Sequence, residues 1–143
     1  MVLYAESAAF TLALTQLTKA AFRRPRPYTY LDGAPAELDS DASLSFFSGH
    51  TALAFALAGT AGYLALTRRS DGSGKYWTLA GTATLAVGTA WLRVASRQHF
   101  VTDVLAGAAV GGSVGILVPH LHRVERGGSV QATPAMLSLG GAF

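Results

Sequence analysis

The segment VLAGAAVGGSVGILVP, at residues 104–119, carries no charged residue and is the stretch that decides the fold. It is too long for an ordinary β-strand, so it predicts a helix. Gly107, Gly111 and Gly115 recur within it every four residues and therefore line one face of that helix. Small residues let a neighbouring helix approach closely, so we interpret this face as a site of tight helix packing.

Three other apolar segments precede it, at residues 2–21, 51–67 and 76–92. Together the four segments predict an all-α fold, an antiparallel helical bundle of about four long helices. Hydrophobic residues make up 50% of the 143 residues and charged residues only 13%, against about 25% in a typical soluble domain. Each uncharged run is slightly shorter than the ~20 residues that span a bilayer. The composition favours a transmembrane bundle and leaves a tightly packed soluble bundle open.

The rest of the chain predicts one domain with a tail. We expect a helical domain at residues 1–125 and a polar, flexible C-terminal tail at residues 126–143. The connection at residues 22–49 is long, and such loops are usually functional or disordered. The chain has no cysteine, which excludes disulfides, thiolate catalysis and cysteine-ligated metals. The net charge of +3 suits an anionic partner, but the bases are not interleaved with aromatic residues, so no nucleic-acid partner is expected.

Polar residues that are far apart in the sequence meet at one end of such a bundle. In four consecutive antiparallel helices, the ends of the first and third lie beside the starts of the second and fourth. These positions hold Lys19, Arg26, Ser48, Gly49, His50, Arg93, His99 and Asp103. The opposite end holds Arg68, Arg69, Lys75, His120, His122 and Arg123, for which no catalytic role is expected. Arg23 and Arg24 are interpreted as a solvated basic turn.

The chemistry of the first cluster suits a phosphate group. Its three cations would balance a multiply charged anion, and guanidinium groups donate paired hydrogen bonds to phosphate. Ser48 and Gly49 would offer free backbone N–H groups at a helix start, where Gly49 allows close approach of the anion. His99 and Asp103 are neighbours on one helix, so the carboxylate can accept a hydrogen bond from one ring nitrogen and leave the other free to attack phosphorus. His50 remains to protonate the leaving group.

Three motifs resemble the signatures of the type 2 phosphatidic acid phosphatase superfamily. KAAFRRPRP, at residues 19–27, matches a lysine, six residues and Arg-Pro. SGH, at residues 48–50, resembles a signature that is usually Pro-Ser-Gly-His, with Phe47 in place of the proline. RVASRQHFVTD, at residues 93–103, matches Arg, five residues, His, three residues and Asp, with Leu92 where the family often has Ser. The order and the internal spacings of all three signatures agree.

The resemblance implies a role for each cluster residue. His50 would be the general acid, His99 the nucleophile and Asp103 its orienting partner. It implies no metal and no cofactor, because cationic side chains replace the metal. Membrane members usually have about six helices, so the chain resembles their catalytic half, and a missing N-terminal segment or a homo-oligomer would cover its remaining apolar surface. The phosphate oxygens would be held by Lys19, Arg26, Ser48, Gly49 and Arg93.

We therefore expect a metal-independent hydrolase of a phosphate monoester or pyrophosphate that acts through a phosphohistidine. Its substrate would be a phosphorylated lipid or a small phosphate ester. We expect an integral protein of the bacterial inner membrane, with the active site facing the periplasm or outside. Two alternatives remain: a soluble non-specific acid phosphatase with the same chemistry, and a vanadium-dependent haloperoxidase. A catalytically inactive scaffold is disfavoured because every chemical position is filled.

Overall fold

The computed structural model describes residues 1–31, 41–67 and 72–127. These residues form four α-helices, α1 (Val2–Phe22), α2 (Gly49–Thr67), α3 (Gly74–Ala95) and α4 (Val101–Gly127), and the short 3-10 helix η1 (Pro27–Tyr30). Among the described residues there is no strand, so the prediction of an all-α bundle of four long helices is confirmed. The expected tail at residues 126–143 lies almost wholly outside the described residues, and the expected domain boundary stays a prediction.

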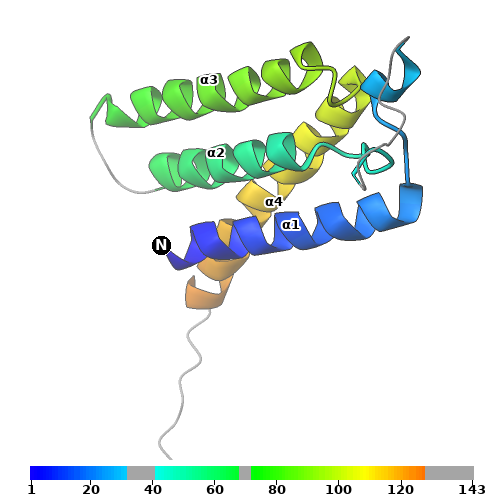
Figure 1. Cartoon of the computed structure of the whole chain (residues 1–143). Helices are drawn as coiled ribbons and strands as arrows, with labels where there is room; N and C mark the ends of the chain where they lie inside the picture. Colours follow the sequence, from blue (N-terminus) through cyan, green and yellow to red (C-terminus); the bar gives the residue numbers. More distant parts are fainter. Residues whose placement is uncertain (32–40, 68–71, 128–143) are drawn as a thin grey trace, which may run out of the picture.

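The helices form a layer with one helix behind it (Figure 1). α1, α2 and α3 lie side by side, and α4 crosses behind them. α2 and α4 each contact all three other helices, whereas α1 and α3 do not contact each other, and α2 lies between them. The outward face of α2 is therefore left open between α1 and α3.

The glycines of α4 bring its backbone directly against α2. A Cβ atom placed on Gly111 would lie 1.9 Å from the carbonyl oxygen of Ala52, and one placed on Gly115 would lie 2.2 Å from that of Ala56. Gly107 meets α2 in the same way, one turn nearer the start of both helices. No side chain fits at these positions, so the prediction that the glycine face serves tight helix packing is confirmed.

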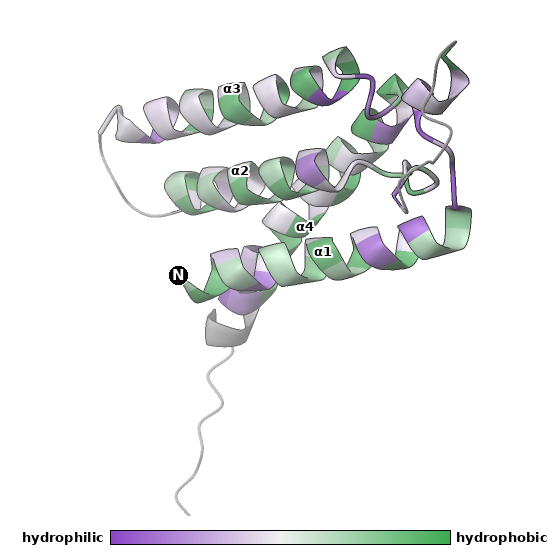
Figure 2. Cartoon of the chain, viewed as in Figure 1, coloured by the Kyte–Doolittle hydropathy of each residue, from purple (hydrophilic) through white to green (hydrophobic). Residues whose placement is uncertain are grey.

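The buried side chains are mostly small, and the largest hydrophobic ones point outward. Ser7 and Thr11 of α1 are fully buried, and the Thr60 hydroxyl of α2 donates a hydrogen bond of 2.9 Å to Ser7 Oγ. By contrast, Trp77 and Trp91 of α3 are 75% and 72% exposed. Figure 2 shows hydrophobic residues along the helices and hydrophilic ones near their ends. By length and composition, α2 (Gly49–Thr67) and the Val101–Arg123 part of α4 are apolar enough to cross a membrane.

Candidate active site

The structure brings the expected cluster together at one end of the bundle. α1 and α3 end there, and α2 and α4 begin there, at the right of Figure 1. Lys19 lies in the last turn of α1, His50 in the first turn of α2 and Arg93 in the last turn of α3. His99 lies in the connection between α3 and α4, and Asp103 in the first turn of α4. The antiparallel connectivity predicted from the sequence is what places these residues side by side.

His99 is buried and held in one tautomer. Its side chain is 1% exposed, and its Nδ1 lies 2.9 Å from the backbone carbonyl oxygen of Ser45. Because a carbonyl oxygen can only accept, Nδ1 carries the proton of this hydrogen bond and Nε2 keeps a free lone pair. Burial, followed by the nearby Arg26 and Arg93 guanidinium groups, lowers the pKa of the His99 imidazole to about 4. The ring is therefore neutral at neutral pH, as a nucleophile must be.

Asp103 does not make the hydrogen bond to His99 that the sequence led us to expect. Its Oδ2 lies 3.8 Å from His99 Nδ1, too far for a hydrogen bond. Oδ2 instead accepts hydrogen bonds from the Ser45 hydroxyl at 2.5 Å and from the Phe100 backbone N–H at 3.0 Å. Phe100 directly precedes α4, so the carboxylate turns back to bond the N–H at the start of its own helix. The two side chains are neighbours as expected, but the expected hydrogen bond was wrong because the Ser45 carbonyl oxygen binds His99 Nδ1, and the Ser45 hydroxyl and the Phe100 N–H bind the carboxylate.

Arg24 is a functional neighbour that the sequence analysis missed. Its Nη1 donates to Asp103 Oδ1 at 2.7 Å and to the Thr102 hydroxyl at 2.9 Å, and its guanidinium carbon lies 4.2 Å from the centre of the Phe100 ring. The interpretation of Arg24 as part of a solvated turn was therefore wrong. Arg23 is exposed and ends α1 with a positive φ of 42°. Neither Arg24 nor Ser45 occupies a fixed position of the three motifs, so no sequence signal pointed to them.

The arginines of the motifs differ in how many partners they have. Arg26 is 7% exposed, and its Nε donates to the Asp41 carbonyl oxygen at 2.9 Å while Nη1 bonds the Gln98 side chain. The Nε of Arg93 is buried and has no hydrogen-bond partner in the described part of the chain. A buried guanidinium donor without a partner is costly, so a bound anion would satisfy it.

The start of α2 is only partly free to bind an anion. The backbone N–H of Ser48 donates to the Asp103 carbonyl oxygen at 3.0 Å, so the expectation that it is free was wrong. A Cβ atom on Gly49 would lie 2.9 Å from Thr15 Cγ2, so the close approach seen at this glycine is to α1. The N–H groups of the first turn of α2 still have no carbonyl within their own helix. They remain the candidates for anion binding here.

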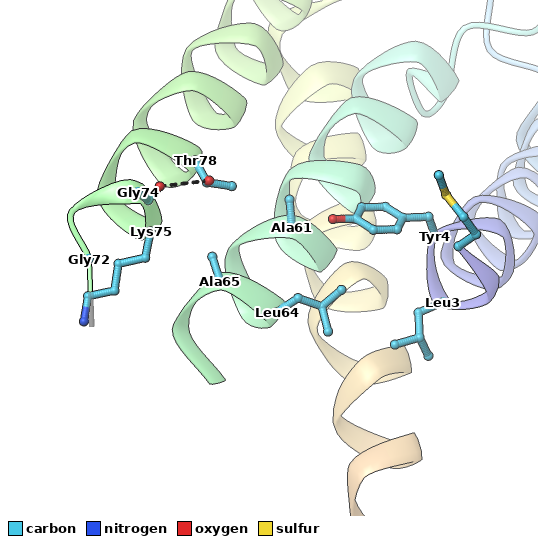
Figure 3. A pocket seen from close by; sticks show the side chains of 10 residues that line it. Leu3, Tyr4, Ala61, Leu64, Ala65, Gly72, Gly74, Lys75 and Thr78 are labelled. Atoms are coloured by element: carbon cyan, nitrogen blue, oxygen red, sulfur yellow. Dashed lines mark hydrogen bonds between the residues drawn. The ribbon is translucent and has the colours of Figure 1, made fainter. Parts of the chain in front are cut away.

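Lys19 and His50 share a pocket of about 180 Å³ that lies between α1 and α2. Leu53 also lines it. A separate, wider pocket of about 540 Å³ begins at Ala54 of α2 and shares no lining residue with the first. This second pocket is lined mainly by α2 and α3 and continues into a third of about 510 Å³, which Figure 3 shows at the far end of the layer. There Tyr4 of α1 points towards Ala61 of α2. An apolar groove therefore runs along the open face of α2, away from His50.

Comparison with known proteins assigns the family. The PAP2 superfamily model matches residues 1–126, so the chain belongs to the PAP2 superfamily, as the three motifs predicted. Among individual relatives, a lipid A 1-phosphatase from Porphyromonas gingivalis is 40% identical over 79 residues, which are 55% of this chain and 16% of that protein. The matched part therefore spans a small share of the relative's length. No solved structure matches the chain.

Proposed function

We propose that this chain is a metal-independent phosphatase that acts through a phosphohistidine on His99. The observation that carries the proposal is the state of this residue: a buried, neutral imidazole whose Nδ1–H donates to the Ser45 carbonyl oxygen and whose Nε2 is free. Such a ring is a ready nucleophile, and the nearby Arg26 and Arg93 supply positive charge for a phosphate group. Membership of the PAP2 superfamily supports the same reaction.

In the first step, the Nε2 lone pair attacks phosphorus and a nitrogen–phosphorus bond forms while the bond to the leaving oxygen breaks. His50 would give a proton to that leaving oxygen. In the second step, His50 would take a proton from a water molecule that attacks the phosphohistidine. Inorganic phosphate and free His99 result, and atoms and protons balance over the cycle.

The cations would stabilise the charge that builds up on the phosphate oxygens. Lys19, Arg26 and Arg93 surround the site from three different segments, and fixed positive groups of this kind can replace a metal ion in phosphoryl transfer. The unpartnered Nε of Arg93 is the donor with most to gain from a bound phosphate. The first turn of α2 would add backbone N–H groups.

The groove along α2 supports a lipid as the substrate. It leads from Ala54 over Leu57 and Ala61 to Leu64, and it begins one turn along α2 from His50. The stretch from Ala54 to Leu64 is about 15 Å long at the rise of an α-helix, which suits an aliphatic chain. A charged pocket at the start of α2 and an apolar groove further along the same helix complement a phosphorylated lipid. The Porphyromonas gingivalis relative, a lipid A 1-phosphatase, is named for a lipid phosphate substrate.

We also propose a location in the bacterial inner membrane, with the active site on the periplasmic side; the helices support the membrane part of this proposal. α2 and α4 are long and apolar enough to cross a bilayer, and large hydrophobic side chains of α1 and α3 point outward. Aromatic residues such as Tyr76 and Trp77 at the start of α3 suit a membrane interface. A preceding segment or a second copy would cover apolar surface that lipid does not.

The test is a panel of phosphate esters assayed by phosphate release, in detergent and with EDTA present. Matched long-chain and short-chain esters of the same headgroup form the decisive pair, with the His99→Ala variant as the blank. We expect turnover in EDTA, preference for the long chain and inhibition by vanadate, which adopts the five-coordinate geometry of the transferred phosphoryl group. Loss of turnover in EDTA that a divalent cation restores would contradict the metal-free mechanism. Equal turnover of both esters by a detergent-free monomer would favour a soluble acid phosphatase, and halide oxidation with added vanadate would favour a haloperoxidase.

A further inference from the structure

We infer that Ser45 is a positioning residue for His99, joining it to Asp103, and that Arg24 holds Asp103 in place for this purpose. The inference rests on the proposed role of His99 as nucleophile. It concerns two residues that lie outside the fixed positions of the three motifs. It also gives Asp103 a different route of action from direct contact with the imidazole.

Ser45 is bonded through all three of its polar groups. Its backbone N–H donates to the Arg24 carbonyl oxygen at 2.9 Å, its hydroxyl donates to Asp103 Oδ2 at 2.5 Å, and its carbonyl oxygen accepts from His99 Nδ1 at 2.9 Å. The residue is fully buried. The hydrogen bonds of the backbone N–H and of the hydroxyl fix the position of the residue. The Ser45 carbonyl oxygen is therefore held at a set position beside His99 Nδ1.

That position controls the chemistry of the ring. A hydrogen bond from Nδ1 to a fixed carbonyl oxygen keeps the proton off Nε2 and sets the plane of the imidazole. When Nε2 attacks phosphorus the ring becomes positive, and both the carbonyl dipole and the Asp103 charge, 3.8 Å away, stabilise it. Asp103 thus acts on His99 in two ways: its charge stabilises the positive ring, and its hydrogen bond to the Ser45 hydroxyl holds the carbonyl oxygen that His99 binds.

Arg24 completes the support from the other side of the carboxylate. It binds Oδ1, whereas Ser45 and the Phe100 N–H bind Oδ2, so both oxygens of the fully buried carboxylate have donors. A buried carboxylate is strongly destabilising unless it is paired and hydrogen-bonded, and the guanidinium supplies the opposite charge. The cation–π contact with Phe100 and the bond to Thr102 keep the guanidinium at the start of α4.

The decisive variant is Ser45→Ala, with Ser43→Ala as the matched control and Ser45→Thr as the rescue. Ser43 is exposed in the same segment, so its change should have no effect. We expect Ser45→Ala to lower kcat by about 10- to 100-fold, the factor that one hydrogen bond to a charged group supplies. KM and inhibition by vanadate should stay within about twofold, because the phosphate-binding cations are untouched. Ser45→Thr, which keeps a hydroxyl, should recover most of kcat.

Three outcomes would overturn the inference: unchanged kcat in Ser45→Ala, equal loss of kcat and vanadate inhibition, or no recovery in Ser45→Thr. A measurement that does not need turnover separates this inference from the proposed function. Nitrogen NMR of His99 should show the Nδ1-protonated tautomer in the wild-type chain and a second tautomer in Ser45→Ala. The same tautomer in both chains would overturn the role of Ser45. A fixed tautomer in a wild-type chain that releases no phosphate would instead reject the proposed function alone.

Discussion

The two ends of the helical layer carry similar side chains but hold them very differently. At the end with the candidate active site, His99 and Asp103 are buried and are bonded to Arg24, which follows α1, and to Ser45, which precedes α2. At the far end, His120 and His122 are exposed. Each makes one contact with another helix: His120 Nδ1 lies 3.0 Å from the Tyr63 hydroxyl, and His122 Nε2 lies 3.2 Å from Glu6 Oε2. Histidines and cations alone therefore do not distinguish the ends.

What distinguishes them is desolvation together with convergence of charge. Burial and two guanidinium groups keep the His99 ring neutral, with its pKa lowered to about 4. Arg24 and Arg26, in the loop after α1, are paired with Asp103 and Asp41. Perturbed titratable groups of this kind mark functional sites more often than residue type does. The predictions below test whether function follows this difference.

The largest effect is expected for His99→Ala, compared with His122→Ala at the far end. Loss of the nucleophile should lower turnover by about 10³-fold or more, because no other imidazole is buried beside a carboxylate among the described residues. His122→Ala should keep nearly full activity. Phosphate release measures both variants, and acid-labile, base-stable label trapped on His99 would support the covalent step. Activity of His99→Ala above about a tenth of wild type would remove it as nucleophile.

A smaller effect, one that depends on the substrate, is expected for His50→Ala, with His120→Ala as the far-end control. A general acid typically contributes about 10²–10⁴-fold, and least where the leaving group is already acidic. A series of esters with leaving groups of different pKa would therefore show the greatest loss for the poorest leaving group. An equal loss across the series would indicate that His50 binds phosphate instead of donating a proton.

The sequence predicted the helical bundle and the end at which the three motifs meet, but not the hydrogen bonds that hold His99 and Asp103. The four-residue spacing of Gly107, Gly111 and Gly115 revealed the packed face of α4, because residues four apart lie on the same face of a helix. Connectivity alone brought the three motifs to one end. Ser45 escaped prediction because its main contact to His99 is made by a backbone carbonyl, which every residue has. Arg24 escaped because its partner depends on the path of the loop that follows α1.

The pH dependence of kcat/KM gives a further test of the buried end. The His99 pKa is lowered to about 4, so the neutral, reactive form persists above that pH and is lost as the pH falls through it. We expect kcat/KM to fall about tenfold per pH unit below pH 4 in an acid limb that is the same for all substrates. A second limb near pH 6 belongs to the phosphate group and should move with the substrate. A substrate-independent loss of kcat/KM as the pH falls through about 6.5, the ordinary histidine pKa, would show that His99 is not desolvated.

The smallest effect on activity is expected for two cysteine variants that test on which side of a membrane each end lies. Ser43→Cys lies beside the candidate active site and Ser73→Cys directly before α3 at the far end, and both serines are exposed. Neither residue belongs to the proposed machinery, so turnover should stay within about twofold of wild type. The chain has no cysteine of its own, so an impermeant thiol reagent would label the introduced residue alone.

We expect labelling of Ser43→Cys in intact cells and protection of Ser73→Cys until the membrane is permeabilised. Short basic connections tend to stay in the cytoplasm. The connection between α2 and α3 contains Arg68 and Arg69, which lie outside the described residues, and Lys75 follows in the first turn of α3. The opposite end is basic as well. Arg24 and Arg26 are paired with carboxylates there, so we expect them to contribute less to keeping that end in the cytoplasm. Labelling of Ser73→Cys with protection of Ser43→Cys would invert the orientation. Equal labelling of both in a detergent-free soluble fraction would reject the membrane location. The proposed chemistry of His99 would then be tested on the soluble protein.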